Sequence, residues 1–255
     1  MKPTIKKNIF RILCNTLTGK TIRLVFGDFI PTIRFPFLTY NIAAIQNQYT
    51  LMASIFWGFY ESAERRLLMK YYDGSQDVVE LGASIGIISS HIAGKLKPNR
   101  KLICVEANSN LLPTLRNNIQ KRISSNSFFY LEHKAVNVKL EEVDFFIASD
   151  TTASSIAAEQ SDETTVIKTT TLSSLVSQYN LSSYFLVCDI EGAEAELLWH
   201  DVRAFDNCIG MIIELHHTHT DGTEKSIDDM VQRCISYFGF HLKEQDGNVF
   251  CFMKY

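Results

Sequence analysis

The pattern of apolar and polar residues becomes regular after Gly74 and stays so to the end of the chain. Short apolar and β-branched runs, typical of buried strands, alternate with segments whose apolar residues recur at the period of a helix. This alternation predicts an α/β fold in which helices cover a mostly parallel sheet. The predicted strands and extended segments are residues 77–81, 101–106, 128–132, 143–148, 166–171, 184–189 and 208–215, and the predicted helices are residues 61–72, 85–96, 111–122, 173–178, 193–199 and 226–238.

Two further signals lie within this regular region. Asp246-Gly247 separates the strand-like residues 241–244 and 248–253, and this dipeptide predicts an antiparallel hairpin that closes the sheet. Residues 149–165 are rich in Ser, Thr and Ala without a clean period, so we expect a loop there.

The first 54 residues lack this regularity. Residues 7–17 are compatible with a helix, and residues 21–38 show a strand-like alternation that is broken by glycine and proline. We therefore divide the chain into an N-terminal extension, residues 1–54, and an α/β domain, residues 55–255.

The charge is unevenly distributed between these two parts. The chain has 255 residues and a net charge of -3, which argues against a general nucleic-acid binder. Its first 40 residues, however, hold seven basic residues against Asp28 alone, a balance of +6. This segment could contact an anionic acceptor or a membrane surface, or it could be a solvated arm or a contact between subunits of a homo-oligomer. The basic residues are Lys2, Lys6, Lys7, Arg11, Lys20, Arg23 and Arg34.

The cysteines and the absence of long apolar runs indicate the compartment. The six cysteines form no C-x-x-C pair, and several lie inside apolar runs, where a reduced thiol packs as a small hydrophobe. The sequence has no 18-residue apolar run and no apolar signal-peptide core. We expect a cytoplasmic protein without a disulfide framework or zinc ribbon.

Glycines follow the first predicted strand, at the place where an open parallel sheet binds its ligands. Gly82 and Gly86 allow the backbone to pass close to a ligand at a helix N-terminus. Their spacing is G-x-x-x-G, which differs from the G-x-G-x-x-G of dinucleotide sites. Glu80 can face a positive group while the amides of the turn meet a negative one. The alternative is a tight turn without a ligand.

A second carboxylate, Glu106, ends the next strand 20 residues after Gly86. An acid at this position can accept hydrogen bonds from both hydroxyls of a ribose. Together with Glu80 it predicts a nucleoside that carries an amino acid, unless Glu106 is a solvated charge at a strand end.

Acidic residues and histidines follow two later strands. Asp189 should lie beside the glycine turn, because its strand neighbours the first strand at the switch point of the sheet. Glu191 follows closely, whereas Glu194 can simply stabilise the first turn of the next helix. His216, His217 and His219 offer a base near neutral pH, but the spacing H-H-x-H matches no standard zinc motif, so we predict no metal site.

Several of these segments, taken in order, resemble the FkbM-type methyltransferases that use S-adenosylmethionine. The resemblance covers residues 58 to 214. Its motifs are Trp57-Gly58-Phe59-Tyr60-Glu61, Val79 to Gly86 (VELGASIG), Val105 to Asn108 (VEAN), Thr170-Thr171-Leu172, Asp189 to Glu194 (DIEGAE) and Ile212 to Leu215 (IIEL).

The resemblance implies the seven-stranded sheet of class I methyltransferases and O-methylation of hydroxyls on sugars and secondary metabolites. It also implies that S-adenosylmethionine contacts Tyr60, Glu61, Glu80, Gly82, Ala83, Ser84, Gly86, Glu106, Ala107, Asn108 and Asp189. The sequence departs from the family at three positions: Glu80 and Ser84 stand where Asp and Asn are usual, and Cys188 stands where a Lys is common.

The sequence thus predicts an O-methyltransferase that acts on a small molecule or a glycan. The candidate bases are Asp189, then His216, then Glu191. One alternative is a metal-assisted methyltransferase that uses Asp189, Glu214 and His216. Another is a binding module that keeps the pocket without turnover.

Overall fold

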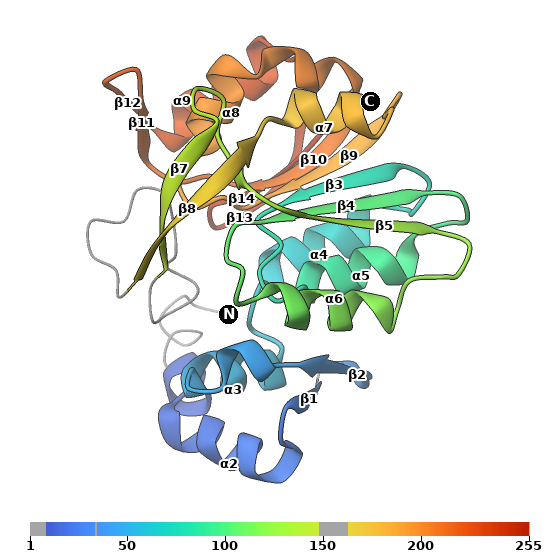
Figure 1. Cartoon of the computed structure of the whole chain (residues 1–255), viewed down its shortest axis with the longest axis vertical. Helices are drawn as coiled ribbons and strands as arrows, with labels where there is room; N and C mark the ends of the chain where they lie inside the picture. Colours follow the sequence, from blue (N-terminus) through green and yellow to red (C-terminus); the bar gives the residue numbers. More distant parts are fainter. Residues whose placement is uncertain (1–8, 34, 148–162, 255) are drawn as a thin grey trace.

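The computed structural model describes residues 9–33, 35–147 and 163–254 (Figure 1). A seven-stranded sheet in the order β13-β14-β10-β9-β3-β4-β5 forms its centre. Five strands are parallel, and β13 and β14 form an antiparallel hairpin at one edge. The predicted fold class is therefore confirmed. The strands are β3 (Asp77–Leu81), β4 (Lys101–Glu106), β5 (Phe128–His133), β9 (Tyr184–Cys188), β10 (Cys208–Glu214), β13 (His241–Asp246) and β14 (Val249–Met253).

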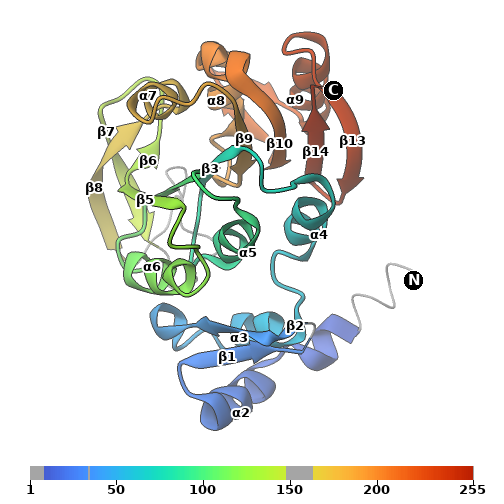
Figure 2. The ribbon, with the colours of Figure 1, turned by 90° about the vertical axis from the view of Figure 1, so that its right-hand side faces the viewer.

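Helices cover both faces of the sheet (Figures 1 and 2). Because successive side chains of a strand point to opposite faces, Val78 packs with the first group of helices, whereas Val79 and Leu81 pack with the second. Burial on both faces explains why the central strands are almost continuously apolar. The first group is α4 (Ser62–Tyr71), α5 (Ile87–Lys95) and α6 (Leu112–Gln120), and the second is α7 (Leu172–Gln178), α8 (Glu194–His200) and α9 (Ile227–Ser236).

The chain reverses its direction of travel across the sheet between β3 and β9. It adds β4 and β5 on one side of β3 and later adds β9 and β10 on the other. Gly82 follows β3, and a Cβ atom there would lie 1.7 Å from the carbonyl oxygen of Asp189. The Asp189 N–H donates to the Leu81 carbonyl at 3.0 Å. Glycine is thus required for the close approach of the two strand ends that opens the crevice.

A smaller three-stranded sheet is inserted between β5 and α7. Its order is β6 (Ala135–Val136), β8 (Glu163–Thr170) and β7 (Glu142–Ile147). The predicted loop over 149–165 lies outside the described residues up to 162. Its last three residues belong to β8, because they pair antiparallel with β7, so that part of the prediction is wrong.

The N-terminal unit consists of α2 (Thr16–Phe26), β1 (Phe29–Thr32), β2 (Phe35–Asn41), the 3-10 helix η1 (Ala43–Ile45) and α3 (Tyr49–Trp57). Its core packs against Ile85, Ile87 and Leu111 of the α/β domain. The boundary that we placed between residues 54 and 55 falls inside α3, which the sequence analysis did not predict. Four of the seven basic residues, Lys2, Lys6, Lys7 and Arg34, lie outside the described residues.

Two predictions in this unit are confirmed only in part. Residues 9–13 of the predicted helix 7–17 are helical, but the Asn15 side chain accepts a hydrogen bond from the Thr18 N–H at 3.0 Å and caps a separate helix, α2. The strand-like alternation at 21–26 is part of that helix, and strands begin only at Phe29. A short hairpin, β11 (Thr218–Thr220) with β12 (Thr223–Lys225), was also missed.

The six cysteines are buried and free, as expected for thiols that pack as hydrophobic residues. None of the helices in the described part of the chain is long and apolar enough to cross a membrane.

Candidate active site

A cleft of about 470 Å³ lies beyond the carboxyl ends of β3, β4, β9 and β10. The segment before α4 and the β13–β14 turn complete its wall. The structure brings nine of the predicted site residues together in this cleft: Tyr60, Glu61, Gly82, Ser84, Glu106, Ala107, Asn108, Asp189 and Glu191.

Glu106 is held rigidly in the cleft by backbone donors. Its two carboxylate oxygens accept hydrogen bonds from the N–H groups of Ser84 and Asn108, both at 2.7 Å. Ser84 adopts a left-handed conformation, with a φ of 48°, which connects the glycine turn to the end of β4. Burial raises the pKa of Glu106, while these hydrogen bonds to the charged form oppose the rise. The fixed carboxylate retains further lone pairs for a ligand's hydroxyl groups.

Glu80 occupies a different place, because its side chain does not line the cleft. It is 2% exposed and accepts a hydrogen bond from the Cys104 thiol at 3.2 Å. Burial raises its pKa to about 7. Ala83 and Gly86 are not among the lining residues either, and Gly86 packs against Leu115 of α6. A direct contact of these three residues with a cofactor stays a prediction.

Two buried carboxylate oxygens in the cleft have no hydrogen-bond partner among the described residues. They are Oε2 of Glu61 and Oδ1 of Asp189. Burial raises the pKa of Glu61 well above its usual range and that of Asp189 to about 7, and neighbouring acids add to both shifts. A cationic group placed between these side chains would relieve the cost of burying them.

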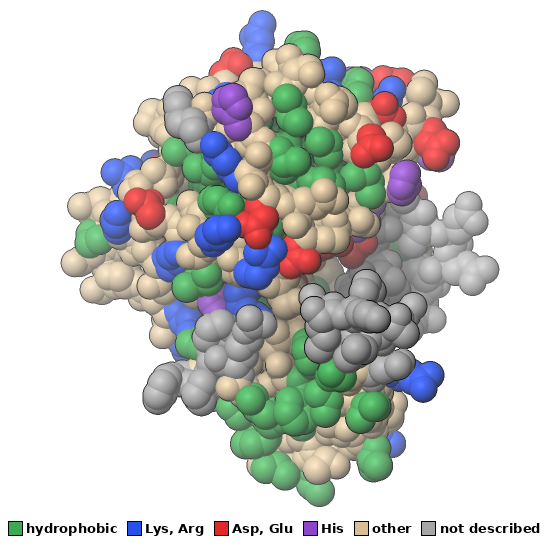
Figure 3. Space-filling view, turned by 180° about the vertical axis from the view of Figure 1, so that it is seen from behind, with side chains coloured by type: hydrophobic (Ala, Val, Ile, Leu, Met, Phe, Trp, Pro, Cys, Tyr) green, Lys and Arg blue, Asp and Glu red, His purple; other side chains and the backbone are tan. Residues whose placement is uncertain are grey.

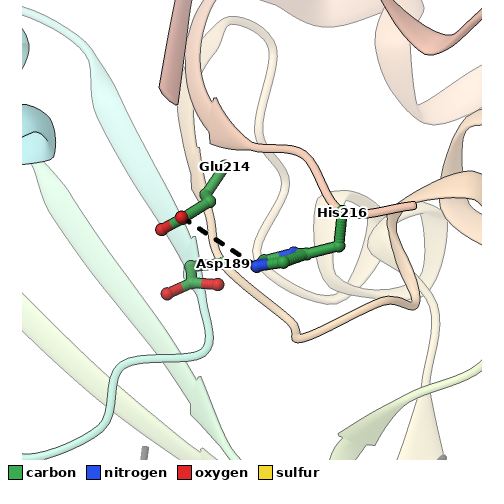
Figure 4. A group of neighbouring side chains, drawn as sticks. All are labelled: Asp189, Glu214 and His216. Atoms are coloured by element: carbon green, nitrogen blue, oxygen red, sulfur yellow. Dashed lines mark ion pairs between the residues drawn. The ribbon is translucent and has the colours of Figure 1, made fainter. Parts of the chain in front are cut away.

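Glu214 and His216 complete an acidic group around Asp189 (Figure 4). His216 Nε2 lies 3.9 Å from Glu214 Oε1 and 3.7 Å from Glu191 Oε2, and its Nδ1 lies 3.2 Å from Glu194 Oε1. The hydrogen bond to Glu194 is the main cause that raises the pKa of His216 to about 9. His216 is not among the residues that line the cleft, but its neighbours Asp189 and Glu214 are.

The other two histidines of the motif, His217 and His219, are exposed and do not line the cleft. Several lining residues were not predicted from the sequence, among them Lys134, Ala135, Val136 and Phe145 in the segment between β5 and α7. Glu64 on α4 lines the cleft, and burial raises its pKa to about 7. The Asp246–Val249 turn also lines it, because β14 pairs with β10 and brings the hairpin turn to the carboxyl end of β10. The Asp246-Gly247 hairpin signal could have predicted that this turn lies at the cleft.

Tyr60 and Glu61 close the cleft from the N-terminal side. The Tyr60 hydroxyl lies 3.4 Å from the Ser84 hydroxyl, across the cleft entrance from the glycine turn. Glu61 has a left-handed backbone, with a φ of 47°, immediately before α4. The Arg65 guanidinium donates to the Gly58 carbonyl at 2.6 Å and fastens this segment to the helix.

A family model, the methyltransferase FkbM domain, matches residues 73–242. No curated protein sequence matches the chain. Similar solved structures include monomeric WbdD, with 9% identity and a TM-score of 0.41, covering 74% of this chain and 40% of WbdD. The fibrillarin of Aeropyrum pernix with natively bound S-adenosyl-L-methionine has 12% identity and a TM-score of 0.38, covering 71% and 66%. This chain thus spans less than two thirds of either protein.

A third similar structure is the magnesium protoporphyrin IX methyltransferase of Synechocystis PCC 6803 with bound S-adenosylmethionine. It has 9% identity and a TM-score of 0.45, and the match covers 98% of this chain and 97% of that one.

Proposed function

Because the chain belongs to the FkbM methyltransferase family, with residues 73–242 as the matched domain, we propose that it transfers a methyl group from S-adenosylmethionine to a hydroxyl oxygen. The acceptor that we propose is a sugar, a glycan or a hydroxylated secondary metabolite. The observation that carries this proposal is the set of carboxylates in the cleft: backbone N–H groups fix Glu106, and one oxygen each of Glu61 and Asp189 has no hydrogen-bond partner among the described residues.

The residues present fit this cofactor. Glu106 can accept the ribose hydroxyls, because backbone N–H groups already fix both of its oxygens. The unpartnered oxygens of Glu61 and Asp189 suit the ammonium and sulfonium charges. When bound, S-adenosylmethionine supplies a methyl group that passes to the acceptor oxygen, while the sulfur keeps the electron pair of the broken bond.

The chain's own residues align the acceptor and take its proton. Asp189 and Glu191 line the cleft and can accept the hydroxyl proton as general bases. His216 Nε2 lies 3.9 Å from Glu214 Oε1, and this contact can position the Glu214 carboxylate. Holding the acceptor oxygen in line with the methyl group supplies most of the rate advantage of such a displacement.

A polyhydroxylated acceptor suits the chemistry of the wall. Glu64, Glu191 and Glu214 line the cleft as half-buried or buried carboxylates, which accept hydrogen bonds from hydroxyl groups. An anionic group beside them would be repelled. These contacts support a neutral hydroxyl as the site of methylation.

Calorimetric titration with S-adenosylmethionine tests the cofactor site. We expect Glu106→Ala to weaken binding at least tenfold, because it removes the carboxylate that faces the ribose. Glu224→Ala is the matched control, since Glu224 is exposed on β12 away from the cleft and should leave binding unchanged. Equal affinities for both variants would contradict the assignment of Glu106.

A labelled-methyl assay against glycans and hydroxylated small molecules tests the reaction. Label in an alkali-stable ether product supports O-methylation. Transfer to an amine in the same panel would contradict the hydroxyl assignment, and tight cofactor binding without transfer to any acceptor would favour the binding-module alternative.

A further inference from the structure

We propose that Asp189, Glu214 and His216 bind a divalent transition-metal cation at the acceptor side of the cleft. The proposed role of this cation rests on the proposed methyl transfer, whereas its binding does not. The sequence predicted no metal site and left these three residues open as the ligands of a metal-assisted alternative.

Three different side chains converge here from two adjacent strand ends (Figure 4). One ligand atom from each of the three residues lies within 4.8 Å of the other two. Three donors bound to one first-row cation at about 2.1 Å lie roughly 3.0 to 3.6 Å from one another. Donor atoms that are up to 4.8 Å apart must therefore approach by about 1 Å or more to close the group around a cation.

His216 is oriented as a metal ligand. Its Nδ1 lies 3.2 Å from Glu194 Oε1, and Glu194 is completely buried. This contact fixes the N–H on Nδ1 and directs Nε2 toward Glu214 and Asp189. A ligating histidine usually donates its second N–H to a carboxylate in this way.

Asp189 provides a second observation, although the same oxygen could also face the positive charge of S-adenosylmethionine. Its Oδ1 is buried and has no hydrogen-bond partner in the described part of the chain, although a buried carboxylate oxygen is normally paired. Within the same described residues, the ion pairs of Glu191, Glu194 and Glu214 all lead to His216, and no lysine or arginine pairs with them. One imidazole cannot compensate several carboxylates.

The donor set selects the class of cation. One imidazole nitrogen with two carboxylate oxygens suits Mn²⁺, Co²⁺ or Zn²⁺, whereas Ca²⁺ and Mg²⁺ prefer oxygen ligands alone. Asp189 and Glu214 both line the cleft, so the open coordination positions face the acceptor. An acceptor hydroxyl on the cation would lose its proton more readily, and Glu191, 3.7 Å from His216, can receive that proton.

Metal binding alone is the direct test. We expect the purified protein without S-adenosylmethionine to bind one equivalent of Mn²⁺, as loss of the free-ion signal in electron paramagnetic resonance. Mg²⁺ should bind at least tenfold more weakly. His216→Ala should lower Mn²⁺ affinity at least tenfold, and Glu194→Gln should do so 10- to 100-fold because Glu194 orients the imidazole. His219→Ala is the matched control and should bind as the unaltered protein does.

Two readouts keep this proposal separate from the proposed function. Calorimetric affinity for S-adenosylmethionine and the melting temperature show whether each variant is folded, and His216→Gln is available if His216→Ala does not fold. No Mn²⁺ binding by a protein that binds S-adenosylmethionine would overturn the metal site and leave methyl transfer intact. Mn²⁺ binding that survives both His216 substitutions would overturn it as well.

Discussion

The cleft buries charge, whereas the N-terminal unit exposes apolar side chains. Glu61 and Asp189, which line the cleft, are half-buried, and each has one carboxylate oxygen without a hydrogen-bond partner within the described residues. On α2, by contrast, Leu17 is 76% exposed and Leu24 87%. Figure 3 shows hydrophobic side chains gathered over this N-terminal unit, at the lower end of the molecule. Both arrangements oppose the usual distribution of residues, and both therefore indicate surfaces with a function outside the folding of the chain.

The two regions differ in what the fold itself demands. The cleft forms because the ends of β3 and β9 approach each other closely. This backbone arrangement sets the positions of the acidic residues at the strand ends. Gly19 and Ile22, on the opposite side of α2, are the buried residues through which this helix packs. The exposed face is therefore not held in place by packing. We therefore expect changes near the cleft to affect both stability and ligand binding, and changes on the α2 face to leave stability unaffected.

The largest effect should follow Gly82→Ala. The added Cβ would lie 1.7 Å from the Asp189 carbonyl oxygen, and the φ of 82° disfavours any side chain. The strand ends must separate, so we expect a loss of about 3 kcal/mol or more in unfolding free energy and loss of S-adenosylmethionine binding. Urea unfolding and calorimetry measure the two effects.

Gly94→Ala on α5 is the matched control, because a Cβ there meets open space. It should be neutral or stabilise by up to about 1 kcal/mol. A similar, small effect of both substitutions would show that the close approach at the switch point is not required.

Glu80→Gln should have the next largest effect. Burial raises the pKa of Glu80 in the folded protein to about 7, from its ordinary value of 4.5. The folded protein therefore holds a proton that the unfolded chain releases, and stability falls as the pH rises from about 4.5 to 7. Removing the charge should flatten this part of the profile and stabilise the protein at pH 8 by up to about 3 kcal/mol. Urea unfolding at a series of pH values measures it, and an unchanged profile would contradict the buried charge.

The sequence predicted the region around Glu80 well and the N-terminal unit poorly, for a physical reason. Strands such as β3 are buried on both faces, so their continuous apolar runs between polar turns show both type and limits. Residues 21–26 pack on one side only, and six residues of alternating character fit a strand or a helix equally. The hydrogen bond from the Thr18 N–H to the Asn15 side chain favours the helix, but it exists only in the folded structure and cannot be read from the apolar pattern.

The candidate site, like the fold, was predicted from the sequence only in part. Strand ends and glycines located the cleft, because carboxyl ends of parallel strands meet at one edge. The direction of each side chain was not available from the sequence: Glu80 turns toward the core, whereas Glu64, on a helix read only for its apolar face, lines the cleft.

A contact of the N-terminal unit with α5 should give the opposite pH dependence. The Tyr40 hydroxyl on β2 lies 2.9 Å from His91 Nε2 on α5. Burial lowers the pKa of His91 to about 3, and the nearby Arg65 and Arg122 add to this. The unfolded chain then binds a proton that the folded protein excludes, so stability is lost as the pH falls below about 6.5.

We expect proton uptake by this histidine in the unfolded chain to lower the unfolding free energy by about 2 kcal/mol between pH 6.5 and pH 5. His91→Gln keeps a hydrogen-bonding partner for Tyr40 and removes the titration, so its loss over the same interval should be smaller. Parallel urea titrations of both proteins measure the difference. Identical slopes would mean that His91 does not carry this dependence.

Substitution on the exposed face of α2 should have the smallest effect on stability. Leu24→Ser should change the unfolding free energy by no more than about 0.5 kcal/mol, because the side chain loses little burial. Ile22→Ala, two residues earlier on the packed side, is the matched control and should cost about 2 kcal/mol or more. Similar costs would show that the Leu24 face is packed in solution, as a subunit contact would make it.

The same variant tests one of the roles left open for the basic N-terminal segment, contact with an anionic membrane. The first 40 residues carry a balance of +6, and the exposed Arg11 and Lys20 accompany the apolar face of α2. Apolar insertion and attraction to acidic headgroups act together in such a surface. Leu24→Ser should therefore reduce sedimentation with vesicles containing phosphatidylserine and leave S-adenosylmethionine binding unchanged. If sedimentation is unaltered and the variant instead dissociates a dimer in analytical ultracentrifugation, the exposed face joins two copies of the chain.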